Sequence, residues 1–115
     1  MADDLDRQLA ALANRRRRAI VLQLGMNPAS ISRLATDVGL SLPAMTKHVG
    51  ILEAAGLVAR RKVGRTTFLA LERSSIRDVQ AWLGQFHAYW GSERETLETQ
   101  ERYLASGPSD AEEAR

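Results

Sequence analysis

Small and hydrogen-bonding side chains share one face of a predicted helix over residues 42–55. Met45, Val49 and Leu52 recur at helical spacing and predict its buried stripe. The outward positions are then Pro43, Ala44, Thr46, Lys47 and Gly50. Small side chains allow close approach to base edges, Thr46 can bond or offer its methyl group to thymine, and Lys47 suits guanine or phosphate. This face is typical of a helix in a DNA major groove, although an ordinary solvated helix has the same pattern.

A basic cluster follows this helix, at the tip of a predicted β-hairpin. Two β-rich runs, residues 57–63 and 66–71, flank a turn at Val63-Gly64-Arg65. The cluster consists of Arg60, Arg61, Lys62 and Arg65. A cationic tip can contact phosphates or the minor groove, because each neutralised phosphate releases counterions. The alternative interpretation is a solvated basic loop.

A second short helix must position the helix over residues 42–55. Ser30 is a candidate cap for a helix over residues 31–38, and Gly39 suits the left-handed residue that ends it. Ser41 can cap the next helix, whose first turn tolerates Pro43. Two helices with so tight a turn predict a helix-turn-helix, whose second helix presents its N-terminal residues to DNA.

Length and composition limit the remaining possibilities. The 115 residues predict one domain, residues 1–104, and a disordered acidic tail, residues 105–115. The absence of cysteine excludes disulfides and thiolate metal sites. No membrane span or signal peptide is recognisable, which favours the cytoplasm. Residues 1–73 carry twelve Lys and Arg against six Asp and Glu, whereas residues 74–115 carry four against eight. This asymmetry indicates a polyanionic partner for the basic part.

Two further helices are predicted before the helix-turn-helix. Residues 3–13 contain an apolar stripe of Leu5, Leu9 and Leu12. Asn14 can cap the next helix, which begins with four consecutive arginines, residues 15–18. Because four neighbours point around the whole helix, they cannot all face one partner. Two roles for these arginines are therefore possible. They can be solvated, with some intramolecular pairing, or they can add contacts with phosphates.

The C-terminal part predicts a long helix, capped by Ser74 or Ser75, that needs a partner. Its apolar side chains follow 3-and-4 spacing at Ile76, Val79, Leu83, Phe86, Trp90, Leu97 and Leu104. One small domain cannot cover so long a stripe, so we expect a homodimer. The expected interface residues are Leu5, Leu9, Leu12, Val79, Leu83, Phe86, Trp90 and Leu97. Trp82, Phe86, Tyr89 and Trp90 can alternatively line a pocket for a small-molecule effector of unknown identity.

The combined pattern resembles a known family. The stretch LATDVGLSLPAMTKHVGILEAAGLVARRKVGRTTFLAL, preceded by ALANRRRRAIVLQL, is similar to the ArsR family of bacterial winged helix-turn-helix repressors over roughly residues 5–104. The resemblance implies a mainly α (α+β) fold in the order helix-helix-helix-helix-strand-strand-helix. It also implies a dimer through the first and last helices, bound to a near-palindromic DNA operator.

Three features depart from the family's pattern. Arg33 stands where a glutamate is common, Gly50 stands where a basic residue is common, and the arginine run replaces a Pro and a single Arg. His48 matches the histidine of the family's recognition helix, and we interpret it as a structural or phosphate-bonding residue rather than a metal ligand. The family's metal sites need cysteine pairs, or Asp, His and Glu on the long helix. Asp78, His87, Glu93 and Glu95 are a nitrogen-poor set there.

The predicted function is therefore a metal-independent, dimeric transcriptional repressor without a cofactor. The recognition-helix residues are Ser41, Pro43, Ala44, Thr46, Lys47 and His48, and the wing residues are Arg60, Arg61, Lys62 and Arg65. No nucleophile elbow, phosphate loop or carboxylate pair supports an enzyme. The alternatives are a metal-sensing repressor of the same family and a winged helix that binds protein instead of DNA.

Overall fold

The computed structural model describes residues 4–90 and 93–106, without the side chains of residues 87–96 and 106. The chain forms two compact units, Met1–Val79 and Gln80–Arg115. The predicted disordered tail began at residue 105, but residues 105 and 106 belong to the last described helix. Residues 107–115 lie outside the described residues, as do the side chains of Tyr89 and Trp90. Among the described helices, none has the length and apolar composition of a membrane span.

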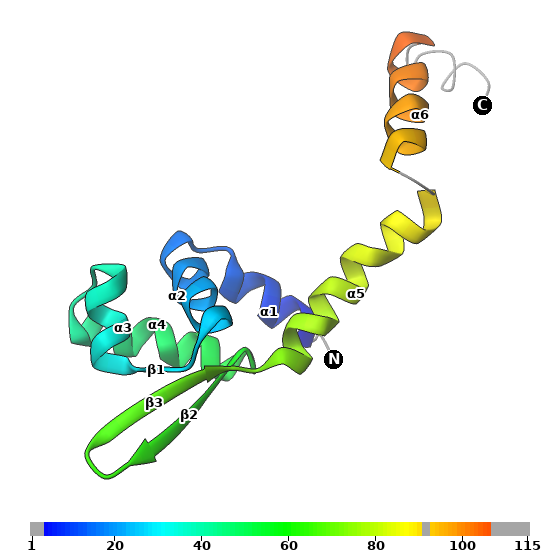
Figure 1. Ribbon diagram of the computed structural model, residues 1–115. Helices are drawn as coiled ribbons and strands as arrows, with labels where there is room; N and C mark the ends of the chain where they lie inside the picture. Colours follow the sequence, from blue (N-terminus) through cyan, green and yellow to red (C-terminus); the bar gives the residue numbers. More distant parts are fainter. Residues whose placement is uncertain (1–3, 91–92, 107–115) are drawn as a thin grey trace. The chain divides into compact units, whose positions relative to one another are not determined.

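Helices dominate the first unit, and a small sheet completes it (Figure 1). The order is α1 (Asp4–Leu12), α2 (Arg15–Met26), β1 (Ala29–Ser30), α3 (Ile31–Val38), α4 (Leu42–Ala54), β2 (Val58–Val63), β3 (Thr66–Leu71) and α5 (Arg73–Trp90), followed by α6 (Glu93–Ser106). The mainly helical winged helix-turn-helix predicted from the sequence is confirmed, with the helix-turn-helix in α3–α4 and the wing in β2–β3.

Local capping chemistry sets the helix boundaries as expected. Asn14 accepts hydrogen bonds from the backbone N–H groups of Arg16 and Arg17, and Ser30 accepts one from Arg33. Gly39 ends α3 in the left-handed region, at a φ of 71°. These contacts satisfy groups that a helix end leaves free, and they fix the short turn before α4.

One hydrophobic core joins the helices of the first unit to its sheet. The fully buried side chains at its centre are Ile20, Leu34, Met45, Val49, Leu52, Leu57 and Leu69. Met45, Val49 and Leu52 confirm the stripe predicted for α4. Their burial turns the opposite face of α4 outward, which is how the core orients the candidate site.

The sheet has one strand more than predicted. The predicted order contains only the two strands of the hairpin, but Ala29 and Ser30 also pair antiparallel with Leu69 and Phe68 of β3. The strand order is therefore β1-β3-β2. A two-residue strand has no periodicity of its own, so only its partner could reveal it.

The start of the C-terminal helix differs from the prediction. We expected one long helix; the structure describes α5 and α6, and residues 91–92 between them lie outside the described residues. Neither Ser74 nor Ser75 is its cap, since α5 begins at Arg73. Ser75 Oγ instead donates to the Gly56 carbonyl oxygen at 2.5 Å and joins the start of α5 to the end of α4.

Candidate nucleic-acid interface

The N-terminal half of α4 presents a face of short side chains. Ser41 caps the helix by accepting a hydrogen bond from the Ala44 N–H at 3.3 Å, and Pro43 occupies the first turn. Ser41, Pro43, Thr46, Lys47 and Gly50 are exposed, whereas Ala44 and His48 are half-buried. The exposed set lies opposite the buried stripe, so it is the part of α4 that a partner can reach.

Leu42 belongs to the same surface and was missed by the sequence analysis. It is the first residue of α4, and 50% of its surface remains exposed. Helical periodicity alone assigned apolar residues to the core, which hid it. An exposed apolar group beside Thr46 can contact a thymine methyl group.

His48 contacts the arginine run of α2. Its Nδ1 lies 3.4 Å from Arg17 Nη1. Burial lowers the pKa of His48 below its usual value, and the cations Arg17, Lys47 and Arg16 lower it further. A neutral ring leaves Nδ1 able to accept a hydrogen bond from the guanidinium. His48 therefore ties the outer helix α4 to α2.

The arginine run also caps helix ends. Arg17 Nε donates to the carbonyl oxygen of Ala11 at 2.6 Å, and Arg18 Nη1 donates to that of Leu12 at 2.9 Å. Carbonyls at a helix C-terminus lack intrahelical partners and carry the negative end of the dipole, so cations are favoured there.

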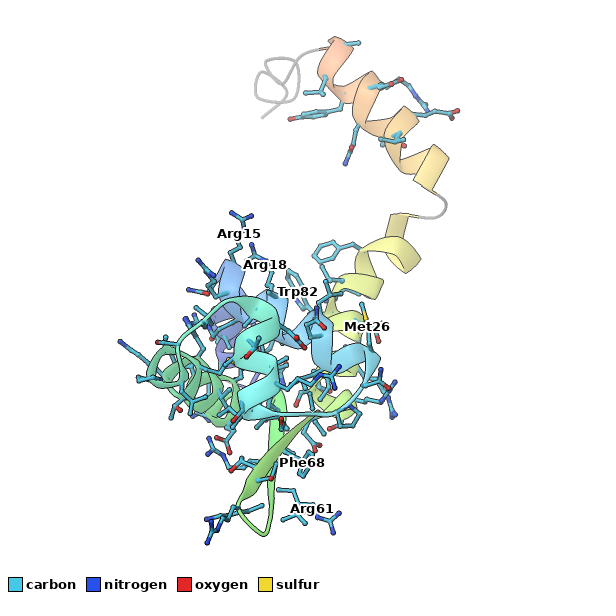
Figure 2. The ribbon with its side chains drawn as sticks, turned by 60° about the vertical axis from the view of Figure 1, so that its left-hand side comes forward. Arg15, Arg18, Met26, Arg61, Phe68 and Trp82 are labelled. Atoms are coloured by element: carbon cyan, nitrogen blue, oxygen red, sulfur yellow. The ribbon has the colours of Figure 1, made fainter. Side chains whose placement is uncertain are left out.

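Arg16 contacts α3, the first helix of the helix-turn-helix. Its Nη1 lies 3.5 Å from the Val38 carbonyl oxygen at the end of α3. Arg15 is exposed and projects from the start of α2 (Figure 2). Three of the four arginines thus make intramolecular contacts with helix ends or with His48. Intramolecular pairing is one of the two roles that the sequence allowed for the arginine run.

The wing carries its cations on a regular hairpin. Arg61 pairs with Phe68, Lys62 with Thr67 and Val63 with Thr66, which leaves Gly64 and Arg65 as the turn. Gly64 has a φ of 63°, a left-handed conformation that this tight turn requires. Arg61, Lys62 and Arg65 are exposed, and Arg61 projects from the strand in Figure 2.

Arg60 differs from the other cations of the wing. Its Nη2 lies 2.6 Å from Glu53 Oε1, and its Nε donates to the same oxygen at 3.1 Å. Glu53 belongs to the last turn of α4, so this ion pair joins the base of the wing to α4. Sequence spacing gave no signal for the pair, because the two residues lie on different elements.

The apolar side chains that were expected at a dimer interface are exposed or half-buried in the single chain, where they are described. On α1, Leu9 is 36% exposed, while Leu5 and Leu12 are half-buried. The buried residues of α1 are instead Gln8 and Ala11, and Gln8 Oε1 has no hydrogen-bond partner among the described atoms.

The same holds for the described residues on the C-terminal helices. Leu83, Phe86 and Leu97 are 56%, 48% and 60% exposed, and Val79 is half-buried. The structure does not describe the side chain of Trp90. The Phe86 ring packs edge-on against Trp82, with centroids 5.2 Å apart. Within the described part of the chain, no group of three or more His, Asp or Glu side chains could hold a metal ion.

Comparison with known proteins agrees with this geometry. A family model described as a helix-turn-helix domain matches residues 12–61. The HTH-type transcriptional regulator Rv2034 of Mycobacterium tuberculosis is 35% identical over 81 residues, which cover 70% of this chain and 76% of that protein. The transcriptional activator HlyU of Vibrio cholerae is 35% identical over 60% of this chain and 64% of its own.

A solved structure extends the likeness to three dimensions. The crystal structure of the ArsR family transcriptional regulator RHA00566 superposes with a TM-score of 0.71 at 34% identity, covering 79% of this chain and all of that one. This chain belongs to the ArsR family of winged helix-turn-helix transcriptional regulators.

Proposed function

We propose that this chain is a sequence-specific, DNA-binding repressor that acts as a homodimer and does not sense metal. Its family consists of transcriptional regulators, not enzymes. The observation that carries the proposal is the pairing, within residues 1–79, of an exposed short-side-chain face on α4 with an exposed cationic wing tip. We place the regulator in the cytoplasm, where bacterial DNA lies.

The two surfaces have different roles in this proposal. Thr46 and Lys47 contact base edges, and Pro43 and Ala44 allow α4 to approach them. Ser41 and His48 contact phosphates at the edges of the groove. Arg61, Lys62 and Arg65 hold phosphates along the wing. Because Glu53 holds Arg60, we assign Arg60 to positioning the wing in addition to any contact with DNA.

A homodimer gives these surfaces their spacing. Leu9, Leu83, Phe86 and Leu97 are large apolar side chains that the single chain leaves at least one-third exposed. Their burial against a second copy would remove apolar surface from water. Two copies related by a twofold axis would set their α4 helices about 34 Å apart, one helical turn of a near-palindromic operator.

The donor set of the sequence supports metal independence. The chain contains no cysteine and two histidines, His48 and His87. The thiolate and imidazole ligands that Zn²⁺ prefers are therefore scarce. Calorimetric titration of the chain with zinc is expected to show no saturable sub-micromolar binding; such binding would instead favour the metal-sensing alternative.

Substitutions in α4 and in the wing test the assignment. Lys47→Ala is expected to weaken operator binding by about 1–3 kcal/mol and to leave nonspecific duplex binding nearly unchanged. Arg65→Ala is expected to weaken operator binding and nonspecific duplex binding about equally. It should also reduce the slope of log affinity against log salt concentration by about one. Fluorescence anisotropy with operator and scrambled duplexes measures both effects across a salt series. If neither variant alters operator affinity, the assignment of α4 and the wing is wrong.

The alternative is a winged helix that binds a protein through the same face. That alternative predicts no duplex affinity for a salt titration to reduce. Repression itself is separable from DNA binding, since one relative, HlyU, is named a transcriptional activator. In-vitro transcription from a promoter that contains the selected operator should fall when the chain is added; a rise would make it an activator.

A further inference from the structure

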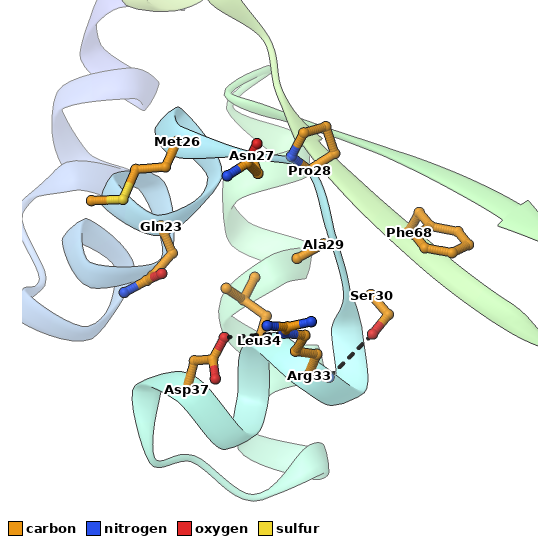
Figure 3. Close-up of a pocket in the computed structure, with 10 residues that line it drawn as sticks. All are labelled: Gln23, Met26, Asn27, Pro28, Ala29, Ser30, Arg33, Leu34, Asp37 and Phe68. Carbon is orange, nitrogen blue, oxygen red and sulfur yellow. Dashed lines mark hydrogen bonds and ion pairs between the residues drawn. The ribbon is translucent and has the colours of Figure 1, made fainter.

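A hollow of about 470 Å³ opens between α2, α3 and the sheet, and none of its lining residues belongs to α4 (Figure 3). Its lining comes from α2, β1, α3, β3 and the segment between α2 and β1. The lining residues are Gln23, Met26, Asn27, Pro28, Ala29, Ser30, Arg33, Leu34, Asp37 and Phe68. This volume lies in the range of small-molecule sites, roughly 300–1,000 Å³.

Apolar groups form the floor and much of the wall. Leu34 is buried and Ala29 half-buried at the floor, with Met26 and Phe68 on opposite sides in Figure 3. Met26 remains 66% exposed and Phe68 40% exposed. Large apolar side chains that line one hollow and remain in contact with water are stabilised when an apolar ligand covers them.

One cation stands at the edge of this apolar surface. Arg33 Nε is 3.9 Å from Asp37 Oδ2, at the outer limit of an ion pair, and the Arg33 side chain is 79% exposed. Such a long, exposed pair contributes little to stability. The guanidinium fork is therefore available for the bidentate hydrogen bonds that a carboxylate accepts.

We propose that this hollow binds a small organic carboxylate with an apolar body, and that its occupancy weakens DNA binding. The apolar body lies over Leu34 between Met26 and Phe68, and the carboxylate accepts hydrogen bonds from Arg33 in place of Asp37. The amide groups of Gln23 and Asn27 line the same hollow and can bond polar substituents.

The position of the hollow provides the coupling to DNA, a part of the inference that rests on the proposed function. Ser30 caps α3 and pairs with Phe68 of the wing, so the hollow adjoins the joint between α3 and the wing. A bound anion also reduces the positive charge of the unit that attracts phosphates. By linkage, DNA must weaken carboxylate binding by the same factor.

Calorimetry on the full chain with 1-naphthoate tests the site without DNA. We expect saturable binding with a Kd on the order of 1 mM or tighter, as for a ligand with few atoms. Neutral 1-naphthalenemethanol and cationic 1-naphthylmethylamine should bind more weakly. The proposal is overturned if naphthoate does not bind, or if either analogue binds as well as naphthoate.

Two variants with opposite expected effects on naphthoate affinity, together with one control variant, locate the bound ligand. Arg33→Gln should weaken naphthoate binding about tenfold, because a charged hydrogen-bonding partner is lost. Asp37→Asn should strengthen binding about two- to fivefold, because the competing carboxylate is removed. Arg73→Gln changes an exposed arginine that does not line the hollow and should have no effect. Equal affinities for all four proteins would place naphthoate elsewhere and overturn the proposal.

A DNA titration with and without saturating naphthoate tests the coupling. Naphthoate should lower the affinity of the wild type for the operator several-fold. At a naphthoate concentration at which the Arg33→Gln variant does not bind naphthoate, the operator affinity of this variant should not change. Naphthoate binding without any change in operator affinity would overturn the regulatory part. A chain that binds no DNA would disprove the proposed function instead, and the calorimetric result would still decide the site.

Discussion

Arg17 contacts two helices besides its own. One edge of its guanidinium donates to carbonyls at the end of α1, and Nη1 lies 3.4 Å from His48 of α4. A single side chain thus joins a helix proposed for dimerisation to the helix proposed to contact DNA. Its neighbour Arg15 is exposed and provides a matched comparison, since both residues lie in the first turn of α2.

Arg17→Ala is therefore expected to lower the free energy of unfolding by about 1–3 kcal/mol, because charged hydrogen bonds to helix-end carbonyls are lost. Arg15→Ala is expected to stay within about 0.5 kcal/mol of the wild type. Urea denaturation followed by circular dichroism measures both. Equal effects of the two substitutions would mean that the arginines act only through their charge.

His48 makes the stability of the first unit depend on pH. Burial and the neighbouring cations lower its pKa in the folded chain, so the unfolded chain binds the proton more readily. The free energy of unfolding should therefore fall as the pH drops from above 6.5 toward the folded pKa. His48→Gln should remove that part of the pH dependence. Denaturation at a series of pH values measures it, and identical profiles for the two proteins would contradict the assignment.

At the scale of elements, α4 and the wing each contain a glycine, but only the glycine of the wing is required by the backbone conformation. Gly50 lies inside α4 with no atom within 4 Å of a Cβ added to it. A helix interior disfavours glycine relative to alanine, so nothing in the fold requires it there. Gly64 also has free space, but its φ of 63° is strained for any residue with a Cβ.

The same substitution should therefore change the stability in opposite directions. Gly50→Ala is expected to raise the free energy of unfolding by about 1 kcal/mol. Gly64→Ala is expected to lower it by about 1–2 kcal/mol, and to weaken DNA binding because Arg65 follows in the turn. Thermal unfolding of the two variants provides the measurement. A stabilising Gly64→Ala would contradict the turn geometry.

At the scale of the whole molecule, the proposed dimer decides whether both α4 helices can bind one operator. Leu83 of α5 and Leu22 of α2 are both apolar and are 56% and 64% exposed in the single chain. Only Leu83 belongs to the proposed interface. A charge at either position should therefore leave the chain folded, which separates assembly from folding.

Leu83→Glu is expected to give a monomer by sedimentation velocity and to weaken operator binding at least about tenfold, since the two half-sites then bind independently. Leu22→Glu should leave both the mass and the affinity unchanged. If Leu83→Glu remains a dimer, or if the wild type is already a monomer, the proposed interface is wrong.

Residues close together in the sequence allowed much of this molecule to be predicted. Ser30, Gly39 and Ser41 act within a few residues of their own position, so the helix-turn-helix and its boundaries followed from local capping chemistry. The periodicity of Met45, Val49 and Leu52 likewise predicted which face of α4 is outward.

Contacts between distant elements were decided only by the tertiary structure. The strand β1, the pair Arg60–Glu53 and the arginine contacts with α1, α3 and His48 each depend on groups that packing brings together. The hollow beside Arg33 has the same origin, since its wall comes from helices and strands that are separate in the sequence. Hydrogen bonds and ion pairs act over a few ångströms, so only folding determines which partners they join.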